Sequence, residues 1–128
     1  MVLSLVLAAA LHAAPAPAPA FAADTLTGIW QVRGDVMGNP LKETCTLRQS
    51  GTVLSGSCTN EEGGPYAVTG EAKDGKFTFK HGGDYQGTAL TIVYSGTLAS
   101  PKAFKGTIEV QPFGAAGTFA AAPAPAKP

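Results

Sequence analysis

Apolar and polar residues alternate along most of the chain after residue 25, in short runs separated by glycine-containing turn signals. Alternation with a period of two is typical of strands that bury one face. The pattern predicts eight strands, over residues 26–33, 41–49, 53–59, 66–72, 77–81, 88–98, 104–110 and 117–121. No segment beyond the N-terminal apolar stretch keeps the 3.6-residue period of an amphipathic helix. The expected fold class is therefore all-β.

The same alternation assigns a face to each residue of the predicted strands. The outward face carries mainly Thr, Lys, Arg and Glu, whereas the inward face is apolar. A meander of evenly spaced strands with one filled face predicts a single antiparallel up-and-down β-barrel of about eight strands. The predicted inward residues are Leu26, Gly28, Trp30, Val32, Leu47, Leu54, Val68, Phe77, Phe79, Leu90, Ile92, Phe104, Ile108, Val110 and Phe119.

The two cysteines, Cys45 and Cys58, flank a hairpin signal. Residues 50–53 (Ser-Gly-Thr-Val) suit a two-residue turn with glycine first, and counting outward from this turn places Cys45 opposite Cys58. Directly opposed residues on paired strands lie at the separation that a disulfide needs. We therefore expect a hairpin disulfide. A redox-active pair is the alternative, but the chain has no C-x-x-C motif and no helix N-terminus to lower a thiol pKa.

Several glycines fall at inward positions of the predicted strands. The expected register places Phe79 opposite Gly70, Leu47 opposite Gly56, and Gly96 opposite Gly106. Glycine weakens a strand unless the bend or the space is needed. Either the glycines let the strands coil so that large rings cross the barrel, or they leave room for a ligand cavity. The first explanation is favoured. The glycines are Gly28, Gly56, Gly70, Gly96 and Gly106.

The connections between strands divide into two groups. Alternate connections of a meander share one end of the barrel. Those at residues 51–52, 74–75 and 100–102 are tight, whereas those at residues 34–40, 60–65, 82–87 and 111–116 look longer and rich in glycine. Binding residues favour longer loops on a rigid scaffold, and ligands favour barrel mouths. We expect the mouth, and any ligand, at the end with the longer connections.

Few polar residues fall at positions that the alternation assigns to the inward face, and most of these lie near the expected mouth. Glu43, Tyr66 and His81 lie near this end, Tyr94 lies deeper, and Tyr85 lies on a mouth connection. These five residues form the candidate ligand-binding set, and none is assigned a catalytic role. An acid–base pair of Glu43 and His81 would need the mouth to close over it. The favoured interpretation is simpler: Glu43 is a rim charge, the tyrosines are core rings with solvated hydroxyls, and His81 ends a strand.

Composition narrows the classes of function. Lys+Arg and Asp+Glu number 9 each, so the net charge is zero, which argues against nucleic-acid binding and against a polybasic membrane surface. The two histidines, His12 and His81, are too few for the usual catalytic zinc site, so no metal is expected. No G-x-S-x-G elbow, Walker loop or dinucleotide fingerprint occurs, so no cofactor is expected. An enzyme is therefore less expected than a binding protein.

The two ends of the chain differ from its middle. Residues 2–14 form an apolar stretch that suits a signal peptide and is too short to span a bilayer. Residues 20–22 (Ala-Phe-Ala) match a cleavage site, although the usual positive residues at the start are missing. We expect a signal peptide over 1–22, a barrel domain over 23–122 and a disordered Ala/Pro tail over 123–128. The expected location is periplasmic or extracellular, without membrane insertion after cleavage. A disordered Ala/Pro-rich arm is the alternative for the N-terminus.

Short glycine motifs give the chain a resemblance to known barrels. The sequence GIW at residues 28–30, followed by LRQSGTVLSGS at residues 47–57, resembles the avidin/streptavidin barrel within the wider lipocalin-like architecture. Residues 47–56, 68–70, 94–97, 105–107 and 117–119 are similar to a small secreted bacterial β-barrel module, found alone or appended to exported amidohydrolases. The resemblance implies a barrel and export. Biotin binding is not implied, because avidins have Asn at the position of Val32 and line the pocket with several tryptophans, whereas Trp30 is the only one here.

Three functions remain open. The favoured one is a non-enzymatic binding module for a small, partly apolar ligand at the barrel mouth. The second is a cofactor-free cyclase or isomerase that uses Glu43, His81 and the tyrosines. The third is a structural or inhibitor-like extracellular protein with no small ligand. A cavity would separate the first two from the third, and a buried Glu43 within hydrogen-bond reach of His81 would favour the second over the first.

Overall fold

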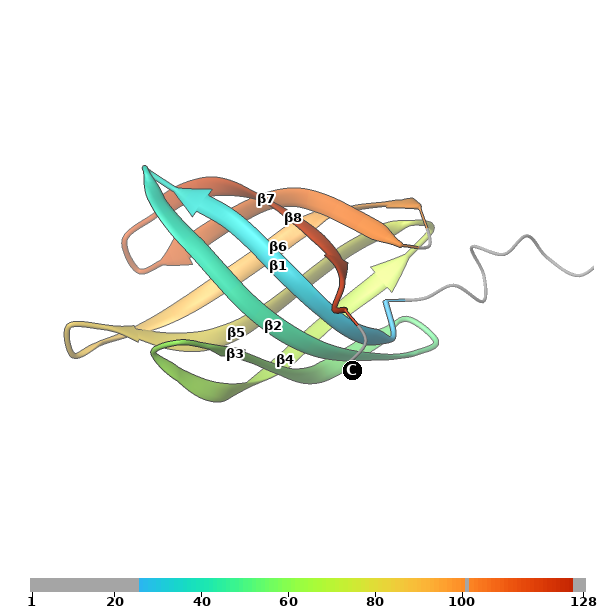
Figure 1. Cartoon of the computed structure of the whole chain (residues 1–128), viewed down its shortest axis with the longest axis horizontal. Helices are drawn as coiled ribbons and strands as arrows, with labels where there is room; N and C mark the ends of the chain where they lie inside the picture. Colours follow the sequence, from blue (N-terminus) through green and yellow to red (C-terminus); the bar gives the residue numbers. More distant parts are fainter. Residues whose placement is uncertain (1–25, 101, 126–128) are drawn as a thin grey trace, which may run out of the picture.

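Eight antiparallel strands follow one another around a closed barrel in the computed structural model, which describes residues 26–100 and 102–125 (Figure 1). Each strand pairs with its neighbours in sequence, and β8 pairs with β1 to close the sheet. The predicted all-β up-and-down barrel is confirmed. The strands are β1 (Gly28–Val36), β2 (Asn39–Ser50), β3 (Val53–Asn60), β4 (Gly63–Lys73), β5 (Lys76–Tyr85), β6 (Thr88–Ser100), β7 (Ala103–Gln111) and β8 (Ala115–Pro123).

The predicted domain, residues 23–122, begins before the described residues and ends within them. The predicted signal peptide, residues 1–22, and the last three residues of the predicted tail lie outside them. Within them, β8 continues to Pro123, and the Ala124 N–H donates to the Ile29 carbonyl at 2.8 Å. Strand pairing therefore extends two residues past residue 122. No helix in the described part of the chain is long and apolar enough to cross a membrane.

The prediction of longer loops at one end of the barrel is wrong. The segments expected as loops continue the strands and end in short turns at residues 37–38, 61–62, 86–87 and 112–114. Both residues of the turn at 37–38, Met37 and Gly38, have positive φ, and so do both residues of the turn at 86–87. Two successive residues with positive φ are the geometry of a type I′ hairpin turn. Glycine and polar residues signal loops in a sequence, but in an antiparallel ladder their backbones pair like any others. We call this end, at the left of Figure 1, the mouth end, and the opposite end the closed end.

The predicted inward face forms the core. Six aromatic rings fill the interior, and Phe79 stacks on Tyr94 with ring centroids 4.8 Å apart. An eight-stranded barrel is just wide enough for side chains to fill it. Leu90 and Val110 are only partly buried, because they lie near the mouth end. The buried apolar residues are Leu26, Trp30, Val32, Cys45, Leu47, Leu54, Cys58, Val68, Ala72, Phe77, Phe79, Ile92, Tyr94, Phe104, Ile108, Phe119 and Ala121.

The predicted disulfide is confirmed. Cys45 and Cys58 are bonded and sit directly opposite each other on β2 and β3, with Cα atoms 4.0 Å apart. Both are fully buried inside the barrel. The disulfide joins the middle of the first closed-end hairpin and is part of the core.

The inward glycines serve the curvature of the sheet. The predicted register is confirmed for Gly70 opposite Phe79, Gly56 opposite Leu47, and Gly96 opposite Gly106. A Cβ atom on Gly106 would lie 1.9 Å from the Ser95 carbonyl oxygen, so only glycine permits this approach of β6 and β7. Because rings such as Phe79 and Tyr94 are fully buried, the glycines let the strands coil and do not leave an empty cavity.

Replacing Gly106 by alanine should destabilise the barrel. The added Cβ would overlap the Ser95 oxygen, and overpacking of this kind costs about 1–3 kcal/mol or more. Gly82→Ala is the matched control, because a Cβ there lies 3.7 Å from its nearest neighbour, the Leu90 oxygen. Chemical denaturation should show a lower free energy of unfolding for Gly106→Ala and a change within about 0.5 kcal/mol for Gly82→Ala. Equal midpoints for the two variants would contradict this role for the glycines.

Trp30 should be an anchor of the closed half of the core. Its ring packs edge-on against Phe104 at 4.6 Å, and its Nε1–H donates to the Leu26 carbonyl at 2.8 Å. Trp30→Ala removes a side chain that is 3% exposed, so it should lower the free energy of unfolding by about 3–5 kcal/mol. Urea denaturation measures this change. A midpoint that barely moved would show that Trp30 is not a core anchor.

Candidate functional site

Four polar side chains meet inside the barrel, on the mouth side of the aromatic core, and we call them the polar cluster: Glu43, Asn60, His81 and Tyr94. Glu43 Oε1 lies 2.9 Å from His81 Nε2 and also accepts a hydrogen bond from the Tyr94 hydroxyl. Glu43 Oε2 accepts from Asn60 Nδ2 at 3.3 Å. Glu43 and His81 are each only 3% exposed. The cluster is therefore a buried ion pair with two additional donors.

Barrel closure brings these residues together. Glu43 lies on β2, whereas His81 and Tyr94 lie on the neighbouring strands β5 and β6. β2 and β5 are not hydrogen-bonded neighbours, so the side chains meet across the interior. Directly paired residues on neighbouring strands point to the same face of the sheet. Glu43 pairs with inward Val32, and Tyr94 pairs with inward Phe79, so both side chains point into the barrel. Local sequence alone does not place them in contact.

Both ring nitrogens of His81 have partners within the protein. Nδ1 lies 2.5 Å from the Gly82 carbonyl oxygen, which can only accept, so Nδ1 carries a proton. Nε2 faces the Glu43 carboxylate. A doubly protonated imidazolium satisfies both contacts, and no buried side-chain nitrogen or oxygen in the described residues lacks a partner.

The pKa values of the cluster agree with an ion pair. Burial alone raises the pKa of Glu43, but its hydrogen bonds and the charge of His81 outweigh burial and hold this pKa below its ordinary value. Burial alone lowers the pKa of His81, but the hydrogen bond and charge of Glu43 bring it above its ordinary value. Burial and then the Glu43 charge raise the pKa of Tyr94, so Tyr94 stays protonated as a donor. Both shifts favour the ionised pair, Glu⁻ and His⁺.

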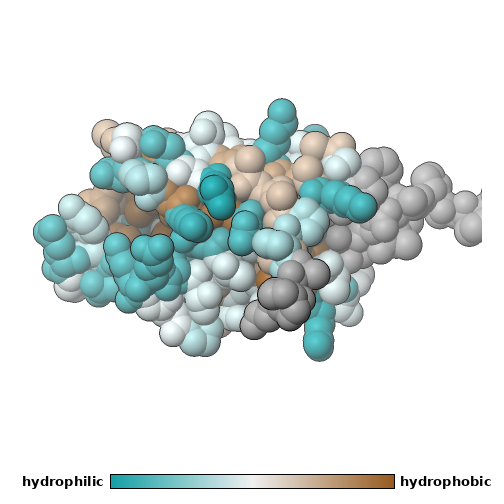
Figure 2. Space-filling model, in the orientation of Figure 1, coloured by the Kyte–Doolittle hydropathy of each residue, from teal (hydrophilic) through white to brown (hydrophobic). Residues whose placement is uncertain are grey.

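Tyr66 and a ring of aliphatic side chains lie around the polar cluster. The Tyr66 ring stacks on His81 with centroids 5.7 Å apart, and Tyr66 is only partly buried. Four partly buried aliphatic residues have inward parity at the mouth end, and we call them the collar: Val36, Leu41, Leu90 and Val110. Figure 2 shows apolar surface among hydrophilic side chains at this left-hand end. The mouth therefore combines an apolar rim with a charged, hydrogen-bonded floor.

The structure brings together four of the five candidate ligand-binding residues. Glu43, His81 and Tyr94 are bonded to one another, and Tyr66 stacks on His81. Tyr85 stands apart: it is 56% exposed at the end of β5, and its ring meets that of Phe113 at 6.2 Å. No contact between Tyr85 and the other four candidate residues supports placing it in the same site.

The simpler interpretation of these residues is wrong in three respects. Glu43 is buried and not a rim charge, the Tyr94 hydroxyl is bonded to Glu43 and not to solvent, and His81 lies within β5 and not at its end. Asn60 was not singled out from the sequence. It has the same parity as inward Cys58, but the expected third strand ends at residue 59 and residues 60–65 were expected as a loop, whereas β3 continues to Asn60.

Charge is divided between the two ends of the barrel. The mouth hairpins, residues 34–41, 58–65, 83–90 and 109–117, contain no Lys or Arg and carry Asp35, Glu61, Glu62, Asp84 and Glu109. The closed-end hairpins, residues 47–55, 71–78 and 97–105, carry Glu71 and Asp74 against Arg48, Lys73, Lys76, Lys102 and Lys105. The two ends therefore have opposite net charge. Despite these carboxylates, no group of three His, Cys, Asp or Glu in the described residues is arranged to hold a metal ion.

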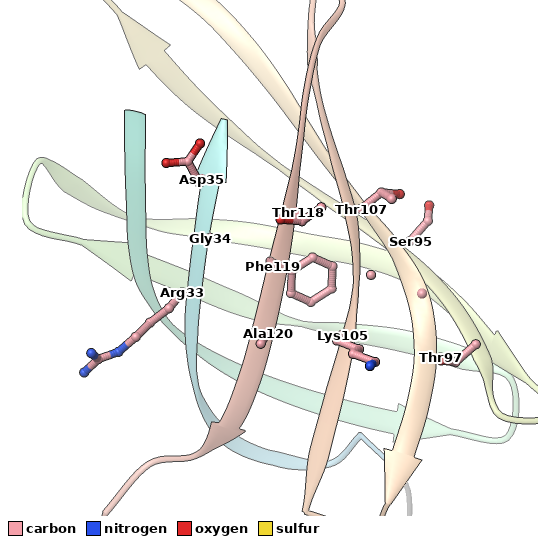
Figure 3. Close-up of a pocket in the computed structure, with 12 residues that line it drawn as sticks. Arg33, Gly34, Asp35, Ser95, Thr97, Lys105, Thr107, Thr118, Phe119 and Ala120 are labelled. Atoms are coloured by element: carbon pink, nitrogen blue, oxygen red, sulfur yellow. The ribbon is translucent and has the colours of Figure 1, made fainter. Parts of the chain in front are cut away.

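Two concavities lie away from the polar cluster. A depression of about 210 Å³ lies at the closed end beside Leu26, Phe77 and Leu98. A larger groove of about 850 Å³ lies on the outer face of β6, β7, β8 and β1 (Figure 3). Neither includes Glu43, His81 or the collar.

Comparisons with known proteins show similarity at the level of fold. No protein-family model and no curated protein matches the chain. Among solved structures, the redesigned β-barrel mFAP1 bound to DFHBI has a TM-score of 0.55 and 19% identity, covering 79% of this chain and 97% of that one. The redesigned β-barrel b11L5F_LGL has a TM-score of 0.56 and 18% identity, covering 81% and 96%. EF1p2_mFAP2b bound to DFHBI has a TM-score of 0.55 and 17% identity, covering 80% and 97%.

The ionisation of the pair gives stability over a defined pH range. The pKa of His81 is raised in the folded protein. Its contribution to the free energy of unfolding is therefore full below the pKa of an ordinary histidine, and it is lost as the pH rises through the pKa of His81 in the folded state. The pKa of Glu43 is lowered in the folded protein. Its contribution to the free energy of unfolding is therefore full above the pKa of an ordinary glutamate, and it is lost as the pH falls through the pKa of Glu43 in the folded state. The pair therefore stabilises the barrel most between about pH 4.3 and 6.5.

Titration of His81 by NMR tests this ion pair. The midpoint of the His81 imidazole should lie above about 6.5 in the unmodified protein. In Glu43→Gln it should fall below about 6.5, because burial then acts on the imidazolium without a carboxylate to oppose it. Glu109→Gln is the control, since Glu109 is exposed and makes no contact with His81. A midpoint that is the same in Glu43→Gln and the unmodified protein would contradict the ion pair.

Proposed function

We propose that this chain is an exported binding module that takes a small, partly apolar ligand at the mouth end of the barrel. The observation that carries the proposal is the position of the polar cluster beside the half-buried collar, at one end only. Binding sites for small molecules combine apolar walls with a few fixed polar groups that orient the ligand. The collar supplies the walls, and the polar cluster with Tyr66 supplies the polar groups.

The cost of burying an ion pair supports a role for it beyond stability. Removing two charges from water costs several kcal/mol per ion, and well-packed apolar residues are often equally stable at such a position. Glu43 accepts from His81, Tyr94 and Asn60, which uses three of about four acceptor sites of a carboxylate. Glu43 is buried within these contacts, so the hydroxyl of partly buried Tyr66 is the group available to a hydrogen-bonding group of the ligand.

Fold and sequence features support the remaining parts of the proposal. Two of the three similar barrels described above are bound to DFHBI, which supports ligand binding by analogy of fold. Export is supported by the apolar N-terminal stretch and its A-x-A motif. The Cys45–Cys58 disulfide suits an oxidising compartment, either periplasmic or extracellular. The resemblance to a small secreted bacterial barrel module leads to the same location.

A cofactor-free cyclase or isomerase is the second candidate. The hydrogen bond between buried Glu43 and His81 meets the criterion set above for an acid–base pair. Both nitrogens of His81 are already used within the protein, however, so neither faces a bound molecule. Proton transfer to a substrate would require the cluster to open, whereas binding does not. For this reason binding is the function proposed, and chemical conversion of a bound compound would favour the enzyme.

A fragment screen by NMR tests the location of the ligand. Small compounds with an apolar body and one polar group should shift the backbone signals of His81, Tyr66 and the collar residues Leu41 and Leu90. Tyr66→Phe should weaken the same compounds about threefold to tenfold, because it removes one hydrogen bond of about 1 kcal/mol. Tyr85→Phe, on the exposed ring that stands apart from the cluster, is the matched control and should have no effect.

Two results of the screen would reject the proposal. Shifts gathered on Gly51, Asp74 and Phe77 with His81 unmoved would place the site in the closed-end depression. The absence of any bound compound, together with native mass spectrometry that finds no carried ligand in protein from its own host, would favour a structural or inhibitor-like protein.

A further inference from the structure

The outer groove consists of three consecutive residues on each of four strands. Its floor is a cross-strand row of inward positions, Gly96, Gly106, Phe119 and Gly34, on β6, β7, β8 and β1. The residues before and after these positions on each strand point outward and form two banks. Figure 3 shows the three rows one above another, with the Phe119 ring in the middle row.

Missing side chains under the floor account for the groove. Three of the four floor positions are glycine, and a Cβ on Gly96 or Gly106 would lie within about 2 Å of a neighbouring backbone oxygen. A Cβ on Gly34 would lie 2.6 Å from the Thr118 oxygen. These oxygens belong to the adjacent strands, so the backbones of neighbouring strands approach one another closely here. The outward side chains of the flanking rows then stand on both sides of a depression.

One bank of the groove consists of hydroxyl groups. Ser95, Thr107 and Thr118 are direct cross-strand partners on β6, β7 and β8, so their hydroxyls lie in line. Asp35 ends this bank on β1, and its Oδ1 accepts a hydrogen bond from the Gly38 N–H at 2.8 Å. Hydroxyl groups both donate and accept, so a row of them suits a ligand that itself carries several hydroxyls.

The other bank carries positive charge. Thr97, Lys105, Ala120 and Arg33 are successive partners, and Arg33 extends outward at the end of the row (Figure 3). The row continues to Lys76 beside Thr97 on one side and to Lys42 beside Arg33 on the other. Lys105 and Arg33 make no ion pair with any described side chain. Cations on β5, β7 and β1 recur at every second strand, about 9–10 Å apart.

From this surface we infer a second binding site: the outer groove takes a segment of an acidic oligosaccharide. Four strands give the groove a length of about 14 Å, and two residues along a strand give it a width of about 7 Å. This shape suits an extended polar chain. The hydroxyl bank bonds the sugar hydroxyls, and Lys105, Arg33 and Lys76 meet carboxylate groups that recur along the chain. This site is separate from the mouth, and it does not depend on the proposed function.

The surroundings of the groove favour a glycan over other ligands. The large exposed apolar side chains of the described residues are Ile29, Met37, Val53, Tyr85 and Phe113, and none of them lines the groove. Nucleic-acid bases commonly stack on aromatic side chains, and the one ring in the groove, Phe119, is 5% exposed. Hydroxyls and cations without exposed rings are suited to a hydroxylated, negatively charged chain.

Calorimetry with paired oligosaccharides tests the inference on the full chain at low ionic strength. The probes are a hexasaccharide of 1,4-linked uronic acids and the same oligosaccharide with its carboxyl groups reduced to alcohols. The acidic form should bind, and the neutral form should bind at least tenfold more weakly. Binding of the acidic form should weaken as salt is added, because exposed charges are screened.

Matched variants assign the binding to the groove. Arg33→Gln combined with Lys105→Gln should weaken the acidic oligosaccharide at least tenfold. Arg48→Gln combined with Lys80→Gln removes the same charge from outside the groove and should change affinity less than twofold. Thr107→Val, which removes a hydroxyl from the other bank, should weaken binding about threefold.

Three results would overturn the inference. The first is no binding of the acidic oligosaccharide. The second is an equal loss of affinity in the two double variants, which would indicate general charge attraction. The third is equal competition by a single-stranded DNA oligomer of the same charge, which would indicate a nucleic-acid or nonspecific polyanion surface.

Discussion

Closure of the sheet by the pairing of β1 with β8 is the constraint on which the rest of the structure depends. A closed sheet of eight strands has no edge, and its interior is narrow enough for side chains to fill it. Large rings such as Trp30, Phe79 and Tyr94 share this space only because strand neighbours such as Gly70 and Gly106 take up almost none. Closure also brings β2 opposite β5 and β6, and so creates the contact between Glu43 and His81.

Alternation and turn chemistry predicted much of this arrangement. The two-residue turn after Ser50 set the register that pairs Cys45 with Cys58, and parity placed Glu43, His81 and Tyr94 inside. The lengths of the mouth hairpins were not predictable, because glycine-rich segments signal loops even where their backbones pair. Asn60 was missed because the expected strand ends at residue 59, whereas the pairing of β3 continues to Asn60.

The depth of the backbone is a second property that the pattern does not contain. Alternation says which way a side chain points, but not how far its backbone lies from the barrel axis. Gly96 and Gly106 were recognised as inward glycines, yet the groove that forms outside them follows from how closely β6 and β7 approach in three dimensions. The same residues thus shape both the packed interior and the outer surface.

The division of charge between the two ends makes the barrel an electric dipole, although its net charge is zero. The mouth hairpins form the negative pole, and the closed-end hairpins form the positive pole. The field of such a dipole extends over about one Debye length, roughly 8–10 Å at physiological ionic strength. Such a field favours cations at the mouth end and anions at the closed end. A neutral composition therefore does not make the two ends of the barrel electrically equivalent.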